Sequence, residues 1–321
     1  MKSFAIAALA AGVIFMGNAA MAQTVGIATS NPGSLYHNIG TAVAKVANEK
    51  GINATIQPAT SPNQYLPAVS AGDLDFGIGN LQEFNYALKG EAWFKGNESP
   101  NLRIVALLYP LKEAIFVRKD SGIKTVADLK GKRMTAGFTA QNTILPQLDA
   151  IYATAGLTRD DVVKVQVPSV VAGADAFMAG ETDGFIFAHG AGKVREADAA
   201  VGGIRALPIE NTPENVAAIK KHWPAGFLVK MAPSPANPGV LEPDTFIAYP
   251  MVLFANKGVK DDIVYKMTRV VYENKDAMAQ IFKPMADFNP KEDAVGDTAP
   301  GEYHPGAIKF YKEVGIWKNG K

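Results

Sequence analysis

A loop of small polar residues, residues 30–34, stands where an apolar run gives way to a helical pattern of apolar residues. Ser34 is a suitable N-cap for that helix. The unpaired N–H groups of the first turn, together with the positive end of the helix dipole, could bind an anion. The alternative is an ordinary turn between a strand and a helix.

Further neutral donors and acceptors follow other strand-like runs, and the loops at the carboxyl ends of parallel strands meet at one edge of a sheet. Two helix starts, at Ser34 and Asn142, would then face an anion, and His189 could donate a hydrogen bond to it. The alternative is that these residues solvate loops and cap helices. The predicted ligand-binding residues are Ser30, Ser34, Tyr36, Gln64, Tyr65, Asn80, Gln82, Thr139, Gln141, Asn142, Thr143 and His189.

The chemistry of catalysis and of metal binding is poorly represented. The chain has no Cys and four His, none of them paired at i, i+4, and it lacks the G-x-S-x-G, P-loop and G-x-G-x-x-G motifs. Glu83 is the one obvious acid near a predicted loop, so the loops favour an anionic ligand. Arg118 could bind a carboxylate group of that ligand, or it could lie on the surface. We therefore predict no catalytic residue, no metal and no cofactor.

The elements that must position these residues alternate in type, as in an α/β fold with a largely parallel sheet. Strands are expected at residues 25–28, 53–57, 74–78, 103–108, 133–136, 163–167 and 185–188. Helices are expected at residues 35–48, 63–70, 82–88, 143–155, 170–179 and 191–199.

The two halves of this pattern resemble each other. AVSAGDLDF at residues 68–76 matches AFMAGETDG at residues 176–184, so that Gly72 and Gly180, like Asp75 and Asp183, are 108 positions apart. Two extended runs, residues 114–118 and 245–258, fit a pair of hinge strands between two similar lobes. Two such lobes would enclose a ligand cleft.

The N-terminus has the features of an export signal. Lys2 precedes an uncharged apolar stretch and then Ala20-Met21-Ala22, an A-x-A cleavage pattern. Cleavage after Ala22 would leave 31 basic and 31 acidic residues in a soluble, periplasmic protein. This balance gives no support for binding nucleic acid.

Several blocks together resemble a known family. They are the Tyr-x-x-x-Gly helix start at residues 36–40, AGDLDFGIGN, FVRKDSGIKTVADLKGKRM, the Gly-x-x-x-x-x-Thr loop at residues 137–143, AGETDGFIF and YPMVLFANKGVKDDIVYKMTRVVYENKD. In their order they are similar to the TAXI-type substrate-binding proteins of tripartite ATP-independent periplasmic (TRAP) transporters. The resemblance implies a type II periplasmic-binding fold, made of two pseudo-symmetric α/β lobes joined by hinge strands.

The same resemblance implies a function and partners. The protein would be a monomeric receptor that closes on a small carboxylate, such as a dicarboxylate, 2-oxo acid or amino acid, and delivers it to a TRAP membrane permease. The expected units are a signal peptide at residues 1–22, lobe I at residues 23–118 and 251–321, and lobe II at residues 119–250. Two alternatives stay open: an ABC-type receptor of the nitrate, sulfonate or thiamine-precursor kind, and a dehydratase-like periplasmic enzyme.

Overall fold

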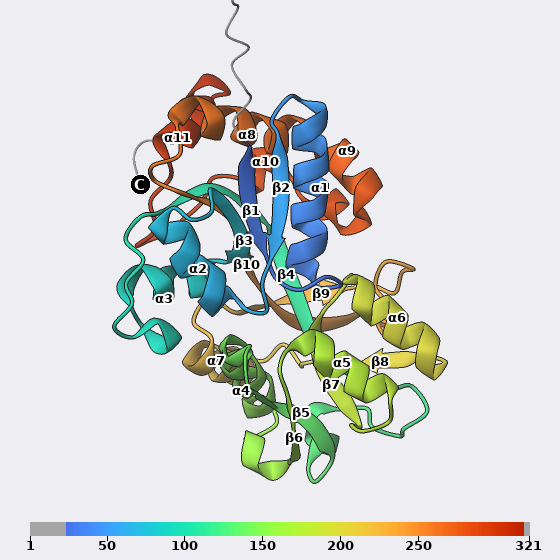
Figure 1. Ribbon diagram of the computed structural model, residues 1–321. Helices are drawn as coiled ribbons and strands as arrows, with labels where there is room; N and C mark the ends of the chain where they lie inside the picture. The colour runs from blue at the N-terminus through green and yellow to red at the C-terminus, as the bar shows by residue number, and fades with distance from the viewer. Residues whose placement is uncertain (1–23, 318–321) are drawn as a thin grey trace, which may run out of the picture.

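A mixed sheet runs through both lobes of the protein in a computed structural model that describes residues 24–317 (Figure 1). The predicted export signal at residues 1–22 lies outside this range. The strand order is β2-β1-β3-β10-β4-β7-β5-β6, with β8 paired to β4 and β9 paired to β10. The strands are β1 (Val25–Thr29), β2 (Ala54–Pro58), β3 (Phe76–Asn80), β4 (Leu102–Arg118), β5 (Arg133–Phe138), β6 (Val163–Val167), β7 (Gly184–Ala188), β8 (Ile204–Ala206), β9 (Phe227–Met231) and β10 (Asp244–Asn256).

Helices cover the sheet of each lobe, and the last part of the chain returns to pack on the first lobe (Figure 1). The α-helices are α1 (Leu35–Glu49), α2 (Pro62–Ala71), α3 (Leu81–Lys89), α4 (Leu145–Ala153), α5 (Val170–Met178), α6 (Gly192–Val201), α7 (Pro213–His222), α8 (Asp261–Glu273), α9 (Lys275–Ile281), α10 (Pro290–Asp293) and α11 (Pro305–Glu313). The short 3₁₀ helices are η1 (Ala92–Phe94), η2 (Val126–Leu129), η3 (Asn142–Ile144), η4 (Arg159–Asp161) and η5 (Lys283–Asp287).

The predicted two-lobe α/β fold is confirmed, and its internal repeat has a physical basis. Asp75 accepts a hydrogen bond from the backbone N–H of Gly26 at 2.8 Å, and Asp183 accepts one from that of Arg133 at 2.9 Å. Each carboxylate thus ties the start of one strand to the start of a parallel neighbour. The glycines that precede them, Gly72 and Gly180, have φ of 88° and 77°, which only glycine adopts without strain.

The first strand and helix pack closely because Gly40 has no side chain. A Cβ at this position would lie 2.4 Å from Cγ2 of Thr29 on β1. The glycine therefore allows α1 to lie against β1, and this close packing fixes where the first turn of α1 emerges. That turn carries Ser34 and Tyr36 toward the junction of the lobes.

The two long strands cross between the lobes side by side. β4 joins two runs that the sequence suggested as separate, residues 103–108 and 114–118, and it pairs antiparallel with β10. Their register shifts between Tyr249 and Met251, where Pro250 lies across from Tyr109 and Pro110. Proline has no N–H to give to a ladder, so a break is expected at this point. The lobe boundaries that the sequence suggested, after residues 118 and 250, stay predictions.

Some expected elements differ in the structure. The helix expected at residues 143–155 is divided into η3 and α4, since Pro146 occupies the first turn of α4 and restricts the backbone before it. Further along the chain, α8 and α9 are separated at Asn274. None of the helices between residues 24 and 317 has the length and apolar character that a membrane crossing requires.

Candidate functional site

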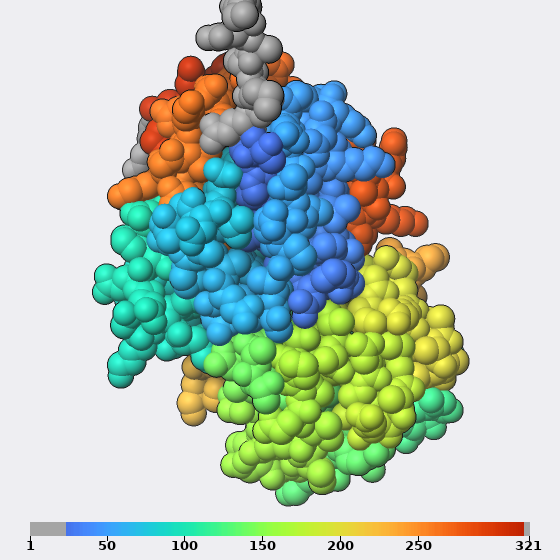
Figure 2. Space-filling view, in the orientation of Figure 1, coloured from blue at the N-terminus to red at the C-terminus, as the bar shows by residue number. Residues whose placement is uncertain are grey.

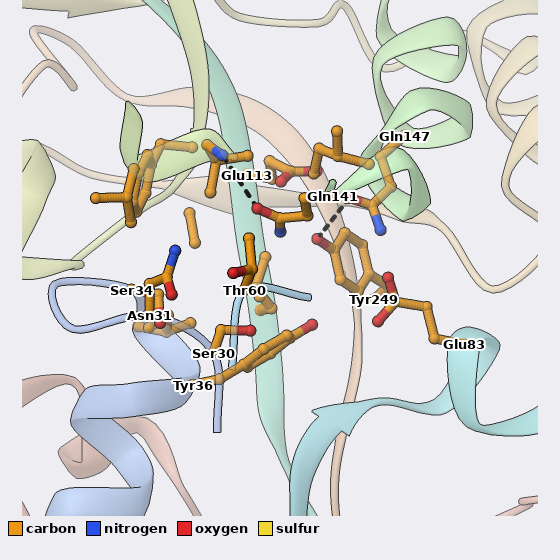
Figure 3. A pocket seen from close by; sticks show the side chains of 17 residues that line it. Ser30, Asn31, Ser34, Tyr36, Thr60, Glu83, Glu113, Gln141, Gln147 and Tyr249 are labelled. Carbon is orange, nitrogen blue, oxygen red and sulfur yellow. Dashed lines mark hydrogen bonds between the residues drawn. The ribbon is translucent and has the colours of Figure 1, made fainter. Parts of the chain in front are cut away.

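A pocket lies between the two lobes (Figure 3). Its space of about 510 Å³ not filled by protein atoms includes open solvent. Side chains from both lobes and from both long strands line it. They are Ser30, Asn31, Ser34, Leu35, Tyr36, Thr60, Glu83, Leu111, Glu113, Gln141, Ile144, Gln147, Val170, Val171, Phe187, Ala188 and Tyr249.

Glu83 enters the pocket from the first turn of α3. Asn80 caps this helix by accepting the backbone N–H of Glu83 at 2.8 Å, which fixes the start of the turn. The side chain is buried, and its Oε2 has no hydrogen-bond partner among residues 24–317. Burial raises the pKa of Glu83 to about 8, against the opposing effect of Thr143 and Asn80.

Glu113 is the second buried acid, and it comes from the centre of the sheet. It lies on β4 across from Ala188 of β7 and Ile247 of β10, so strands flank it on both sides. Within the described part of the chain, its Oε2 also lacks a hydrogen-bond partner. Burial, and then the nearby charge of Glu83, raise the pKa of Glu113 to about 8, and Tyr249 opposes the rise.

Two glutamines and a tyrosine connect the acids to the second lobe. The Tyr249 hydroxyl lies 3.4 Å from Oε1 of Gln147 on α4. Gln141 accepts the backbone N–H of Val170 at 3.0 Å, at the start of α5 (Figure 3). Gln147 thus faces a tyrosine of β10, and Gln141 joins the loop after β5 to the start of α5.

The pocket differs in character from one end to the other. Figure 3 shows Asn31 and Ser34 at one end and Glu83 beside Tyr249 at the other. Ser34 caps α1 by accepting the N–H of His37 at 3.2 Å, whereas the buried Ser30 Oγ has no hydrogen-bond partner in the segment that the structure describes. Among the described residues that line the pocket, none is Lys, Arg or His.

Four of the predicted binding residues line this pocket: Ser30, Ser34, Tyr36 and Gln141. They come from the loop before α1, from α1 itself and from the loop after β5, as the sequence suggested. The α/β topology brings these loops together because they follow the carboxyl ends of parallel strands. Their contact with a ligand stays a prediction.

Three other predicted residues do not line the pocket, because their polar atoms are used within the first lobe. Gln64 accepts the N–H of Thr60 at 3.1 Å, and Tyr65 donates to the carbonyl of Ile78 at 2.7 Å. Asn80 caps α3 and donates from its amide to the Tyr36 hydroxyl at 3.1 Å. These residues shape the lobe I wall, and Asn80 orients a tyrosine that does line the pocket.

Gln82 is likewise absent from the pocket wall. Its side chain reaches across to the other lobe, where Oε1 accepts the backbone N–H of Ala225 at 2.9 Å. It thus forms a bond between the lobes.

His189 is absent from the same wall, since its ring is packed edge-on against Phe116 and Phe246. Burial lowers the pKa of His189 to about 3, with a smaller effect of Lys112. The imidazole is therefore neutral near pH 7, and its contact with a ligand stays a prediction.

The remaining predicted residues are Thr139, Asn142 and Thr143, and none of them lines the pocket. Thr139 is exposed, and Thr143 is buried next to Glu83. Asn142 begins η3, a 3₁₀ helix of three residues, and not a full α-helix. It therefore lacks the helix dipole on which the expected anion contact depended.

The sequence left open whether Arg118 binds the ligand or lies on the surface. It is exposed, and its guanidinium binds Asp120 at 3.1 Å.

One further expectation about charge needs correction. The sequence also suggested few acids in the cleft and hence a carboxylate ligand. Instead Glu113, which sequence reasoning missed, joins Glu83 in the pocket wall. The sequence feature that could have revealed Glu113 is its position as a charged residue inside the mainly apolar run LLYPLKEAIFV.

Solved structures share this architecture. A protein of Bordetella bronchiseptica RB50 is 16% identical, with a TM-score of 0.56 over 91% of this chain and 98% of its own. PhnD1 from Prochlorococcus marinus, solved with methylphosphonate, is 11% identical, with a TM-score of 0.53 over 91% and 98%. A putative sulfonate-binding SsuA from Methylobacillus flagellatus KT is 17% identical, with a TM-score of 0.50 over 92% and 96%. These matches show the periplasmic-binding fold, and at such low sequence identity they show the fold alone.

A protein-family model described as the NMT1-like family matches residues 27–315 of the chain, and this match shows the family. The Methylobacillus protein is named as part of an ABC transporter. The expectation of a TAXI-type receptor that serves a TRAP permease is therefore wrong. The motifs that suggested it mark the strand–turn–helix junctions of the fold, and related receptor families share that fold. The chain belongs to the NMT1-like family.

Proposed function

We propose that the protein is an exported, monomeric solute-binding receptor that delivers a small polar molecule to an ATP-driven (ABC-type) permease. The observation that carries this proposal is the buried pocket lined from both lobes, beside long strands whose pairing is irregular at Pro250. Closure of two lobes around a solute buries it from water and presents a changed surface to a permease. The family and the ABC transporter named among the structural neighbours support this partner.

Contacts between the lobes support closure as the working motion. In Figure 2 the blue segment around α1 lies directly against the green and yellow segment around α5 and α6. Lys193 donates its N–H to the carbonyl of Gly33 at 3.3 Å, and the Asn31 amide lies 3.5 Å from Ser169 Oγ. These bonds exist when the lobes are together, and a ligand that adds contacts to both lobes would favour that state.

The experiment combines binding, shape and turnover. A panel of small metabolites is screened by thermal shift, and hits are measured by calorimetry and small-angle scattering. We expect saturable binding, a smaller radius of gyration with ligand, and recovery of the ligand unchanged. Absence of saturable binding across the panel would contradict the receptor proposal. Conversion of the ligand would favour an enzyme instead, since Glu83 and Glu113 have pKa values near 8, which suit acid–base chemistry.

The transporter class has a separate test. The neighbouring genes should encode an ATPase with a Walker motif and a permease, and uptake in reconstituted vesicles should require ATP. Uptake that proceeds without ATP would contradict the ABC assignment while leaving the receptor role intact.

Replacing Gln82 by Ala should favour the open state without altering the pocket wall. The change removes the bond to the N–H of Ala225, worth about 0.5–1.5 kcal/mol. The closed population should therefore fall by about two- to tenfold relative to the open one. Fluorescence transfer between labels on the two lobes would measure this.

Gln82→Glu is the matched control, because a carboxylate still accepts the Ala225 N–H. This variant should stay close to the wild-type distance distribution. Identical distributions for Gln82→Ala and wild type would remove this bond from the closing equilibrium.

A further inference from the structure

The acidic end of the pocket has unused acceptors. Oε2 of Glu83 and Oε2 of Glu113 are both buried, and neither has a hydrogen-bond partner among the described residues. Both side chains line the space between the lobes, from α3 and from β4. Two buried acceptors without partners are costly, so each needs a group that completes it, such as a water, an ion or a ligand.

The same end has no compensating positive charge. Among the described lining residues the basic types are absent, and Lys112, next to Glu113 in sequence, forms an ion pair with Asp287 outside this pocket. Glu83 and Glu113 therefore repel each other when both are ionised. A ligand cation would remove this repulsion, and an anion would increase it.

We propose that Glu83 and Glu113 bind a protonated nitrogen group of the solute, such as an ammonium, amidinium or guanidinium. This inference rests on the receptor function proposed above and specifies its ligand. N–H donors on the solute give the two free carboxylate oxygens charge-assisted hydrogen bonds. Tyr249 and Gln147, which are bonded to each other beside the acids, form the neutral wall next to that group.

A competing arrangement predicts the opposite dependence on pH. Protonated carboxyl groups could donate to an anion such as a sulfonate, and that binding would weaken as they ionise. Binding of a cation would instead become stronger as the two acids ionise with rising pH. The other titratable groups facing the two acids are Tyr36 from α1, Tyr65 from α2 and Tyr249 from β10, and burial raises the pKa of each above 10. The acids alone therefore titrate in this wall between pH 6 and 9.

The first experiment compares isosteric probes of different charge. Benzamidine, benzamide and benzoate, and the smaller acetamidine, acetamide and acetate, are titrated by calorimetry at pH 6.5 and pH 8.5. The amidinium ions keep their charge over this range. We expect an amidinium to bind more tightly than its amide and carboxylate analogues. Its affinity should increase at least about fivefold at the higher pH, as the acids lose their protons.

The second experiment changes the acids while keeping their shape. Glu83→Gln and Glu113→Gln should each weaken amidinium binding at pH 8.5 by about tenfold or more, and should flatten its pH dependence. The affinity for the neutral amide should change little, which shows that the pocket is still formed. Glu181→Gln, at an exposed position, removes the same charge far from the pocket wall and should leave all affinities unchanged.

The outcomes separate this inference from the receptor function. Tighter binding of the carboxylates, or amidinium binding that weakens with rising pH, would overturn the cation assignment while the protein remains a receptor. Equal losses for the amide and the amidinium in the Gln variants would overturn it too, because charge would not be what the acids recognise. If neither these probes nor the metabolite panel saturates, both proposals fail.

Discussion

The ligand-free protein should lose stability as the pH rises from 6.5 to 8.5. The pKa values of Glu83 and Glu113 are about 8 in the fold, compared with 4.5 for an unperturbed glutamate. The native state therefore holds protons that the unfolded chain has released. Stability from these groups is fully present below pH 4.5 and is lost as the pH rises through 8. We expect the free energy of unfolding to fall by on the order of 2–4 kcal/mol over this interval.

Three histidines oppose this trend at the lower end of the interval. Burial lowers the pKa of His37, His189 and His304, so their contribution to stability rises with pH until the unfolded imidazoles have lost their protons, at about pH 7.5. The upper half of the interval therefore reports mainly on the two acids. Urea unfolding at several pH values measures the effect. The double variant Glu83→Gln/Glu113→Gln should remove most of the slope and be more stable than wild type at pH 8.5. Equal slopes in the two proteins would contradict the assignment.

The cost of these acids fits a binding role better than a structural one. A glutamine at either position would keep the shape without the cost of an ionisable group. A ligand bearing a protonated nitrogen would recover the lost stability, because it binds the ionised form. An amidinium that binds should thus raise the melting temperature more at pH 8.5 than at pH 6.5.

The fold could be predicted from sequence because its signals are local. Short apolar runs between helical patterns predict an α/β sheet, and Asp75 and Asp183 recur because each ties two parallel strands together. The crossing strands were recognised in part, since Pro110 divides the apolar run of β4 in two. A proline is expected to end a strand, but here it lies at a ladder irregularity between two long paired strands.

The site could be predicted less well, because the pocket wall depends on which way each side chain faces. Ser30, Ser34 and Tyr36 come from the first strand–helix loop, and their place follows from the topology alone. Gln82 lies in an equally suitable loop, and only the position of Ala225 on the other lobe decides that it bonds there. Glu113 lies within a strand and not after one, so a search of loops does not find it.

Trp223, just after α7, shows how packing between the lobes supports the same site. Its side chain is fully buried, with its ring 5.5 Å from that of Tyr249 on β10 and 6.5 Å from that of Tyr86 on α3. Tyr249 in turn lines the pocket and contacts Gln147. Trp223 therefore holds in place a tyrosine beside the two acids.

Trp223→Ala should lower the free energy of unfolding by about 3–5 kcal/mol, the usual cost of the cavity left by a large buried aromatic residue. It should also weaken binding of an amidinium probe, because Tyr249 loses the ring packed edge-on against it.

Trp223→Phe is the matched control. The indole Nε1 has no hydrogen-bond partner among the described residues, so phenylalanine removes an unsatisfied donor while keeping an aromatic ring beside Tyr249. This variant should cost less than about 2 kcal/mol and keep most of the affinity. Equal losses for the two variants in urea unfolding would show that the indole N–H has a partner, and equal affinities for Trp223→Ala and wild type would separate this packing from the pocket.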